Sequence, residues 1–468
     1  MKKLRLALPA AAAIALVATS SAAAFTPTNA YYSKQWYLEQ DQAFAAWPTT
    51  PPTLDPVKVA LIDSGVDCSL PDFANQIVAK KSFVGGDPCK DTEGHGTIVA
   101  GEIAGALNAA GVVGLAYSSQ LIVAKVVASD GTIPLTAEAD AIRWAVQQGA
   151  RVINMSFGAV RDPANPALDT YSKVEAQAIA YAVKHKAIIV AAVGNSDEAY
   201  ATPWPYASWP AALPHVIGVG ALTRTGNVPD FSDEDPVYVD IAAPGTGIFS
   251  TFPKSLTGAQ SSCAPQGYTD CASGDYRNPE GTSFAAPQVS AAAAVLLGLN
   301  PALTPSQVTT ILERQTDDVS ASTGCAACPS GRDMFSGWGS LDVQKAVAAV
   351  TQGNLPPSDR FEPNDTVQQA YRLRGPRPMA GATLDYWDDR VDVYRVKLAR
   401  GQRLLARVRA RPTVNLVLLA GPKTPLAQSP TGQKQRLAYR VRQTGWYYVE
   451  VRCAAGAGRY TLRLDESS

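Results

Sequence analysis

The chain has 468 residues, of which 46% are hydrophobic and 18% are charged. This composition excludes a disordered chain, and the length leaves room for two or three globular domains. Lys and Arg together balance Asp and Glu at 41 each. Residues 25–354 nevertheless carry 18 basic and 31 acidic side chains, whereas residues 355–468 carry 20 basic and 10 acidic ones. A neutral chain is therefore built from an acidic part and a basic part.

The first residues have the pattern of an export signal. Cationic residues at positions 2, 3 and 5 precede the apolar run Leu6–Val17, and Ala22 and Ala24 fit the small-residue rule for cleavage. The run is shorter than the ~20 residues that span a bilayer, so a signal at residues 1–24 is favoured over a membrane anchor. No later membrane span is expected. The mature protein is therefore predicted to be secreted, in an extracellular or periplasmic location.

Short apolar strands alternate with helical segments through the acidic part. β-branched runs predict strands at Val57–Ile62, Leu121–Val127, Arg151–Ser156, Ala187–Val193 and Val216–Ala221. Helical spacing predicts helices at Ala137–Gln148, Lys173–Lys186, Ala285–Leu299 and Ser306–Gln315. Alternation of this kind predicts an α/β fold with a doubly wound, mostly parallel sheet.

The pattern changes after residue 352, where Pro and Gly are frequent. Beyond it the helical spacing disappears, and alternating apolar segments predict an antiparallel β-sandwich with strands at Val391–Leu398, Arg403–Val408, Val414–Leu419 and Tyr447–Arg452. We expect an α/β domain over residues 25–352, a linker at 353–358 and a β-sandwich over 359–468.

Three residues of catalytic type stand where predicted strands end or helices begin: Asp63, His95 and Ser283. A serine hydroxyl becomes a good nucleophile when an imidazole removes its proton, and a carboxylate then orients that imidazole. Each residue alone has an ordinary structural explanation, as a helix cap or a turn residue. Of the three histidines, His95 is the best candidate base because it lies between two glycines.

Together these segments resemble the motifs of subtilisin-like serine proteases (the subtilases, peptidase family S8), in the Asp, His, Ser order of that family. The resemblance extends from about Tyr31 to Val350. It implies a Ser283–His95–Asp63 triad that needs no cofactor. The segment Ala191–Asn195 also matches, which implies that Asn195 donates its side-chain amide to the oxyanion.

The same resemblance implies a substrate-binding strand. Ser156, Phe157 and Gly158 would lie beside the residue before the scissile bond, and residues 129–134 would form the opposite rim. An extended polypeptide held by main-chain hydrogen bonds is the expected substrate, with broad specificity toward unfolded proteins. Phe157 has an alternative role as a core residue.

A structural calcium site is a further expectation of the resemblance. Asp72 matches a calcium-binding carboxylate of the family, and the facing loop would be residues 107–112. That loop has Ala109 where an oxygen-bearing side chain is expected. The alternative is that Asp72 caps the turn after Pro71.

The seven cysteines fit an oxidising compartment. Proximity along the chain favours the pairs Cys68–Cys89, Cys263–Cys271 and Cys325–Cys328, with Cys453 left free. Cys325 and Cys328 have two alternatives, a redox motif or half of a zinc site. No second pair of this spacing supports zinc, so a structural bridge is favoured.

The basic part resembles the bacterial pre-peptidase C-terminal domain through Phe361–Asp365, Asp389–Tyr394, Gly445–Val449 and Tyr460–Leu462. Its excess of arginine favours docking on the acidic domain or attachment to anionic surfaces. Nucleic acid is not an expected partner, because no nucleic-acid-binding motif accompanies the charge.

A secreted serine endopeptidase is the function favoured by these features. Three rivals come from other classes. One is a binding or chaperone-like protein on an inactive protease scaffold, which would not need all four site residues. Another is an esterase, although the nucleophile lacks a Gly-x-Ser-x-Gly elbow. The third is a thiol oxidoreductase that uses Cys325 and Cys328.

Overall fold

A computed structural model describes residues 25–47, 54–196, 201–256, 276–277, 279–375, 378–422 and 425–467. The predicted signal at residues 1–24 lies outside the described residues, and so does the predicted Cys263–Cys271 pair.

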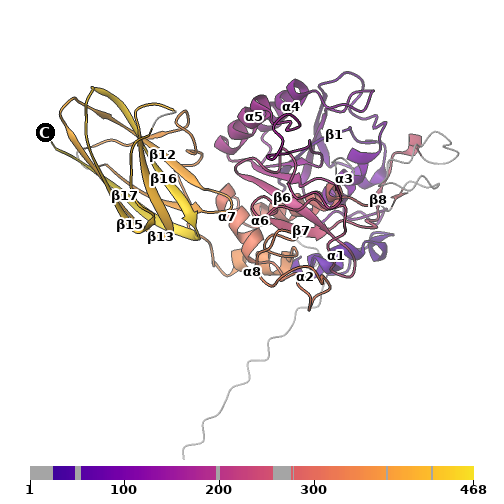
Figure 1. The fold of residues 1–468 in the computed structure, drawn as a ribbon. Coiled ribbons are helices and arrows are strands. Elements are labelled where there is room, and N and C mark those ends of the chain that lie inside the picture. The colour runs from indigo at the N-terminus through magenta and orange to yellow at the C-terminus, as the bar shows by residue number, and fades with distance from the viewer. Residues whose placement is uncertain are drawn as a thin grey trace, which may run out of the picture.

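The acidic part forms a parallel sheet of seven strands in the order β2-β3-β1-β4-β5-β6-β7 (Figure 1). The strands are β1 Lys58–Asp63, β2 Ile77–Ser82, β3 Gln120–Lys125, β4 Val152–Met155, β5 Ile188–Ala192, β6 Val216–Leu222 and β7 Ile241–Pro244. The predicted α/β fold is thus confirmed. Apolar patterns in the sequence predicted the five inner strands but not β2 and β7, whose patterns are shorter or broken by polar residues.

Alternate residues of each inner strand point to opposite faces of the sheet, and each face has its own core. Val59 and Leu61 belong to the core under α3, α6 and α8, whereas Ala60 and Ile62 belong to the core under α4 and α5. The helices of this part are α1 Trp36–Gln40, α2 Ala43–Ala46, α3 His95–Ala104, α4 Leu135–Gln147, α5 Lys173–Lys184, α6 Ala286–Leu299, α7 Pro305–Arg314 and α8 Val343–Thr351. The described residues of this part also include the short 3-10 helices η1 Tyr32–Lys34, η2 Pro71–Phe73, η4 Lys254–Leu256 and η5 Thr282–Phe284, and a two-stranded sheet of β8 Ser250–Thr251 and β9 Tyr276–Arg277.

Helix α6 crosses the larger core, and nearly all of its residues are apolar and buried. Within the described residues, one helical stretch, Thr282–Leu299, is long and apolar enough to cross a membrane, and it is largely buried inside the protein. It is therefore accounted for as a core helix.

After β1 the chain forms β2 and β3, which lie on one side of β1 in the sheet. It then passes through α4 to β4, which lies on the other side of β1. The direction of winding therefore reverses beside β1. Open α/β sheets form their binding crevice at such a point, outside the carboxyl ends of the strands. This is the edge at which Asp63 ends β1 and the chain leaves β4 and β5.

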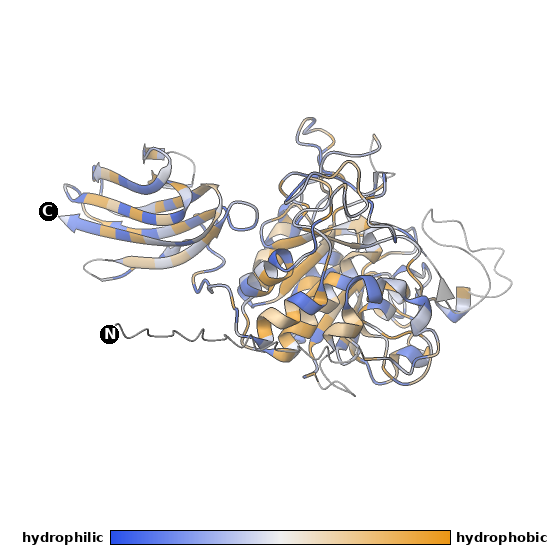
Figure 2. Ribbon diagram, turned by 90° about the horizontal axis from the view of Figure 1, so that it is seen from below, coloured by the Kyte–Doolittle hydropathy of each residue, from blue (hydrophilic) through white to orange (hydrophobic). Residues whose placement is uncertain are grey.

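The basic part forms a separate β domain with a core of its own (Figure 1). Its strands are β10 Tyr371–Arg372, β11 Met379–Asp385, β12 Val391–Leu398, β13 Arg403–Leu419, β14 Pro425–Gln428, β15 Gly432–Arg440, β16 Gly445–Ala455 and β17 Ala457–Ser467. Their pairings are antiparallel except for a short parallel pair between β10 and β12. Hydrophilic and hydrophobic residues alternate along these strands (Figure 2).

Strand β13 corrects one detail of the sequence analysis. The two strands expected at residues 403–408 and 414–419 are one continuous strand, Arg403–Leu419. Its first half pairs with β15 and β17 and its second half with β14 and β16, with shifts of register near residues 409–414. Pro412 and the two arginines before it indicate a turn in sequence, but the strand crosses this region because both halves find partner strands.

Candidate active site

Asp63 and His95 are brought together by the end of a strand and the start of a helix. Asp63 is the last residue of β1 and His95 is the first residue of α3. The His95 Nδ1 atom lies 2.8 Å from Asp63 Oδ1, and the backbone N–H of Ser64 donates to the same oxygen at 2.7 Å. Asp63 is only 2% exposed. A buried carboxylate held in this way fixes which nitrogen of the imidazole faces the cleft.

The close approach of α3 to β1 depends on Gly96. A Cβ atom at this position would lie 2.2 Å from the Gly65 carbonyl oxygen and 3.0 Å from Asp63 Oδ1. Any side chain here would push the helix away from the carboxylate. Glycine therefore makes the His95–Asp63 distance attainable.

A buried network behind this pair was missed by the sequence analysis. The Ser64 hydroxyl donates to Asp91 Oδ1 at 2.8 Å and accepts from the Gly96 N–H at 2.9 Å. Asp91 Oδ2 accepts from both the N–H and the hydroxyl of Thr97, at 2.9 and 2.6 Å. Asp91 thus holds the first turn of α3. The pattern Asp91-x-x-x-x-x-Thr97 carries no general signal, so only the fold reveals it.

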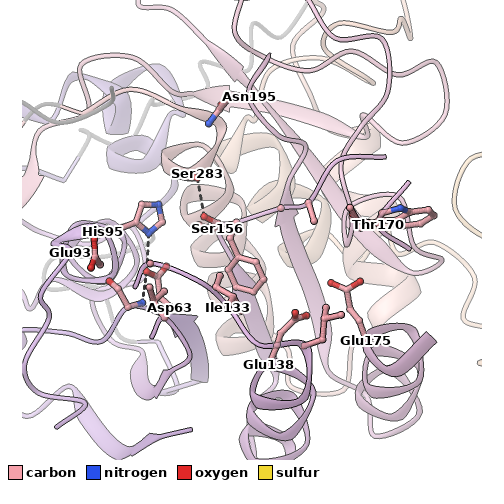
Figure 3. Close-up of a pocket in the computed structure, with 18 residues that line it drawn as sticks. Asp63, Glu93, His95, Ile133, Glu138, Ser156, Thr170, Glu175, Asn195 and Ser283 are labelled. Carbon is pink, nitrogen blue, oxygen red and sulfur yellow. Dashed lines mark hydrogen bonds and ion pairs between the residues drawn. The ribbon is translucent and has the colours of Figure 1, made fainter. Parts of the chain in front are cut away.

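Ser283 lies in the short 3-10 helix η5, just before α6. It is half-buried, and its hydroxyl donates to the Ser156 carbonyl oxygen at 2.9 Å. Figure 3 shows Ser283 and His95 on the same cleft, with the hydrogen bond from Ser283 to Ser156 drawn as a dashed line. The nucleophile candidate is thus positioned between the histidine and the predicted substrate-binding strand.

The side-chain amide of Asn195 is oriented by Thr282, the residue that precedes Ser283. Asn195 Oδ1 accepts from the N–H of Thr282 at 3.0 Å and from its hydroxyl at 3.1 Å. Because the oxygen is held by these donors, the nitrogen is the end of the amide that faces the cleft (Figure 3).

These residues line one cavity of about 440 Å³. Ser156, Phe157 and Gly158, which follow β4, line this cavity, and so do Gly131 and Ile133 of the predicted rim. Phe157 also packs against the core under α4 and α5. Phe157 therefore lies both at the cavity and against the core, and its role in binding substrate stays a prediction.

Asp72 is fully buried, and its Oδ1 accepts from the Val112 N–H at 2.8 Å. Nearby, the carbonyl oxygens of Ala106, Ala110 and Val112 converge on the side-chain amide of Asn29, at 2.9, 2.6 and 2.8 Å from Nδ2. Sequence reasoning missed Asn29, which lies about 80 residues from this loop.

The disulfide predicted between Cys68 and Cys89 is present, with Cα atoms 5.1 Å apart, and so is the pair Cys325–Cys328. Cys453 is free and buried, as expected. The first bridge ties the chain between Asp63 and His95 and so braces the loop that joins them.

Comparison with known proteins agrees with this geometry. Residues 55–339, more than half of the chain, match the model of the subtilase family. The chain belongs to this family. Subtilases are serine endopeptidases, so this protein is a hydrolase of peptide bonds, and the family needs no cofactor for catalysis.

The match to individual subtilases covers most of the length of each of them. Subtilisin DY of Bacillus licheniformis is 35% identical over 253 residues, which are 54% of this chain and 80% of that protein. Thermitase of Thermoactinomyces vulgaris is 31% identical over 300 residues, which are 63% of this chain and 93% of that one. A protease structure from Pseudoalteromonas arctica superposes with a TM-score of 0.56 at 25% identity, covering 69% of this chain and 99% of that structure.

Proposed function

We propose that this subtilase is a secreted endopeptidase that cleaves extended or unfolded polypeptides through Ser283, His95 and Asp63. The observation that carries the proposal is the 2.8 Å contact between His95 Nδ1 and Asp63 Oδ1, in the same cleft as the Ser283 hydroxyl.

In the proposed reaction His95 acts first as a base and then as an acid. Its Nε2 atom takes the proton of the Ser283 hydroxyl as the oxygen attacks the scissile carbonyl. His95 then gives that proton to the leaving amine, and the acyl-enzyme is hydrolysed by water in the same manner. Asp63 stays ionised and stabilises the imidazolium through Nδ1. The hydroxyl of Ser283 has to turn from the Ser156 carbonyl toward His95 for the first step.

Asn195 is the proposed donor to the oxyanion. Its nitrogen faces the cleft because Thr282 holds its oxygen, and the backbone N–H of Ser283 supplies the second donor. A donor fixed before the reaction begins stabilises the developing charge without reorganisation, an effect worth about 2.7–4 kcal/mol in this class of enzyme.

The polypeptide is proposed to lie along Ser156–Gly158 as an added strand. Main-chain hydrogen bonds to these residues are independent of sequence, which favours chains that are already extended. Gly158 packs closely on Ser208, where a Cβ atom would approach the Ser208 Cβ to 2.9 Å, so this wall is held firmly.

The decisive experiment compares hydrolysis of unfolded casein by the wild-type chain, by Ser283→Ala and by Ser330→Ala. Ser330 is an exposed serine outside the cleft, which makes it a matched control. Activity in the wild type and Ser330→Ala with near-complete loss in Ser283→Ala supports the proposal. Equal activity in all three would refute the assignment of Ser283. Activity in none, with all three shown to be folded, would favour a binding protein.

Export is proposed from the signal pattern at residues 1–24 and from the two disulfides. Within this proposal the mature catalytic domain is residues 25–352, followed by the linker 353–358 and the β domain 359–468.

Calcium is proposed to bind beside Asp72 as a structural ion. The donors there are oxygens of the kinds that Ca²⁺ prefers: the Asp72 carboxylate and the three convergent carbonyl groups at Ala106, Ala110 and Val112. The three carbonyl groups accept from Asn29 Nδ2, so the ion would require the Asn29 amide to turn and present Oδ1, which is buried and accepts no hydrogen bond within the described residues. With the amide turned in this way the residues fit the ion, which would stabilise the loop and take no part in hydrolysis.

The C-terminal domain is proposed to dock on the catalytic domain through its few carboxylates. Arg314 Nη2 contacts Asp385 Oδ2 at 2.7 Å, and the rings of Trp338 and Trp387 meet edge to face at 5.0 Å. The cation of this ion pair belongs to the acidic catalytic domain and the carboxylate to the basic C-terminal domain. The excess arginines of the C-terminal domain are therefore not involved in the contact.

That excess is concentrated on the outer face of β13 and β15. Three pairs of like charges stand directly opposite each other there: Arg403 with Arg440, Arg407 with Arg436, and Arg409 with Lys434. We call these six exposed residues the basic face. Opposed like charges destabilise a strand pair, so we propose that the basic face binds anionic surfaces while the carboxylates make the docking contacts.

A further inference from the structure

The active-site cleft contains two buried carboxyl groups that the proposed hydrolysis does not use. Glu138 and Glu175 line the same cavity as Ser283 and His95, yet they are only 2% and 4% exposed. They belong to the first turns of the neighbouring helices α4 and α5. Figure 3 shows their carboxyl groups close together at the end of the cleft away from His95.

Helix capping does not account for Glu175. Ser172 and Glu175 have the spacing of a capping box, and the Ser172 hydroxyl accepts from the Glu175 N–H at 3.2 Å. In a complete capping box the Glu175 carboxylate would bond back to the Ser172 N–H. It interacts with Glu138 instead.

Glu138 has an incomplete set of partners. Its Oε1 atom is buried and has no hydrogen-bond donor within the described residues. Burial and, to a smaller extent, the adjacent Glu175 carboxylate together raise the pKa of Glu138 to about 9. Burial raises the pKa of Glu175 as well. The pair therefore retains a proton at neutral pH when the cleft is empty.

The lining of the cleft offers this pair no internal counter-ion. The other charged groups among its described lining residues are Asp63, Glu93 and His95, and none is Lys or Arg. Burying two carboxyl groups without a cation lowers the stability of the folded protein. The pair is therefore not explained by a contribution to folding. A cation brought by a ligand would replace the shared proton and satisfy the free oxygen.

We propose that Glu138 and Glu175 form a subsite for the Lys or Arg side chain of a substrate, at one position on the acyl side of the scissile bond. This inference rests on the proposed function. The strand Ser156–Gly158, proposed to hold residues before the scissile bond, lines the same cavity, and Figure 3 shows Ser156 between Ser283 and the two glutamates. Ile133 and Phe157 supply apolar surface for the aliphatic stem of the side chain.

The test uses quenched-fluorescence peptides with an invariant cleavage site. Lys, Arg, norleucine and Glu are placed in turn at each of several positions before the scissile bond. Norleucine has the stem of lysine without its charge, so the ratio of kcat/KM for Lys and norleucine isolates the ionic contribution. At one position we expect the wild type to favour Lys and Arg by about tenfold or more.

The variants are Glu138→Gln, Glu175→Gln and the double variant. The matched control is Asp140→Asn, which removes a charge from an exposed side chain of the same helix, α4. The double variant should reduce the Lys/norleucine ratio to near one and keep its activity on the norleucine peptide. The control should keep the wild-type ratio. Thermal unfolding of each chain shows whether it is folded, and either single variant replaces the double variant if the latter does not fold.

Two results would overturn the inference: no preference for Lys or Arg at any position in the wild type, or an unchanged preference in the double variant. Binding of the Lys and norleucine peptides to Ser283→Ala, measured by calorimetry, separates this inference from the proposed function. If the wild type hydrolyses no peptide but the Lys peptide binds more tightly, the subsite stands and the proposed hydrolysis fails. If both peptides are cleaved and bound equally, hydrolysis stands and the subsite fails.

Discussion

His95 Nδ1 is 2.8 Å from Asp63 Oδ1, and this distance joins the first residue of α3 to the last residue of β1. The two residues are 32 positions apart in sequence. Because His95 begins α3 and Asp63 ends β1, the packing of α3 on the sheet sets the distance between the two side chains.

Replacing Asp63 tests the role of this contact. Asp63→Asn keeps the shape of the side chain but favours the wrong tautomer of His95 and cannot stabilise its cation. We expect kcat on a peptide substrate to fall by about 10⁴-fold while KM changes little. Circular dichroism is the control for folding. A loss of less than tenfold would show that Asp63 does not orient the base.

Gly96→Ala is expected to damage activity through geometry. The new Cβ atom would lie 2.2 Å from the Gly65 carbonyl oxygen, so α3 has to move away from β1. Steady-state kinetics should show kcat reduced by about 10²-fold or more, because catalysis is sensitive to displacements of about 1 Å. Gly381→Ala is the comparison, since a Cβ atom there meets nothing within 4 Å and Gly381 lies in β11, outside the cleft. Equal activity of the two variants would contradict the argument.

Removal of calcium should lower the thermal stability of the wild-type chain. An ion present at about 100 times its Kd contributes about 2.7 kcal/mol, which corresponds to roughly 4 °C in Tm for a domain as large as residues 25–352. Scanning calorimetry with EDTA and with added CaCl₂ measures the shift. In Asp72→Asn the response to EDTA should be much smaller. A wild-type Tm that is the same under both conditions would exclude a stabilising calcium site.

His215 makes one contact between the domains sensitive to pH. Its Nε2 atom lies 3.0 Å from Asp365 Oδ1 and 3.2 Å from Glu362 Oε2. Burial lowers the pKa of His215, but the Asp365 and Glu362 carboxylates together outweigh burial and raise the pKa well above 6.5. Because the folded state binds the proton more tightly, this stabilisation is complete below about pH 6.5 and is lost as pH rises through the raised pKa.

The corresponding measurement is the difference in Tm between the wild type and His215→Gln as a function of pH. The difference should be largest below about pH 6.5 and should shrink at alkaline pH. His185→Gln serves as the control, because His185 is exposed at the end of α5. A difference that grows with pH would reverse the sign and contradict the assignment.

The basic face should determine retention on anionic matrices. Arg407→Gln/Arg436→Gln removes one opposed pair, and the full chain should then elute from a sulfated polysaccharide column at lower salt. Arg143→Gln/Lys184→Gln removes two charges from α4 and α5 and should elute like the wild type. Casein hydrolysis should be unchanged in both. Identical elution of all three chains would refute a role for the basic face.

Local sequence was enough to predict the five inner strands and the main helices. Their apolar residues recur with the period of the helix or strand that they form, so the pattern is visible within a short stretch of sequence. Asp63, His95 and Ser283 could be proposed as a site for a similar reason, because each lies in a short segment with Gly at the end of a strand or the start of a helix. Asn195 was added by the resemblance to the subtilases.

Contacts between distant segments had to come from the tertiary structure. In sequence Glu138 and Glu175 are ordinary acidic residues in the first turns of two helices, where the helix dipole favours negative charge. Packing of α4 beside α5 turns both carboxyl groups into the cleft and buries them together. Asn29 likewise meets the loop at residues 106–112 only through folding.

The sequence by itself therefore determined the class of fold, the chemistry and the residues proposed to carry it, because those signals are local. The tertiary structure decided which charges face one another: Glu138 with Glu175, Arg407 with Arg436, and His215 with Asp365. Charge pairing depends on distance in space and on burial, and neither quantity is encoded in the spacing of residues along the chain.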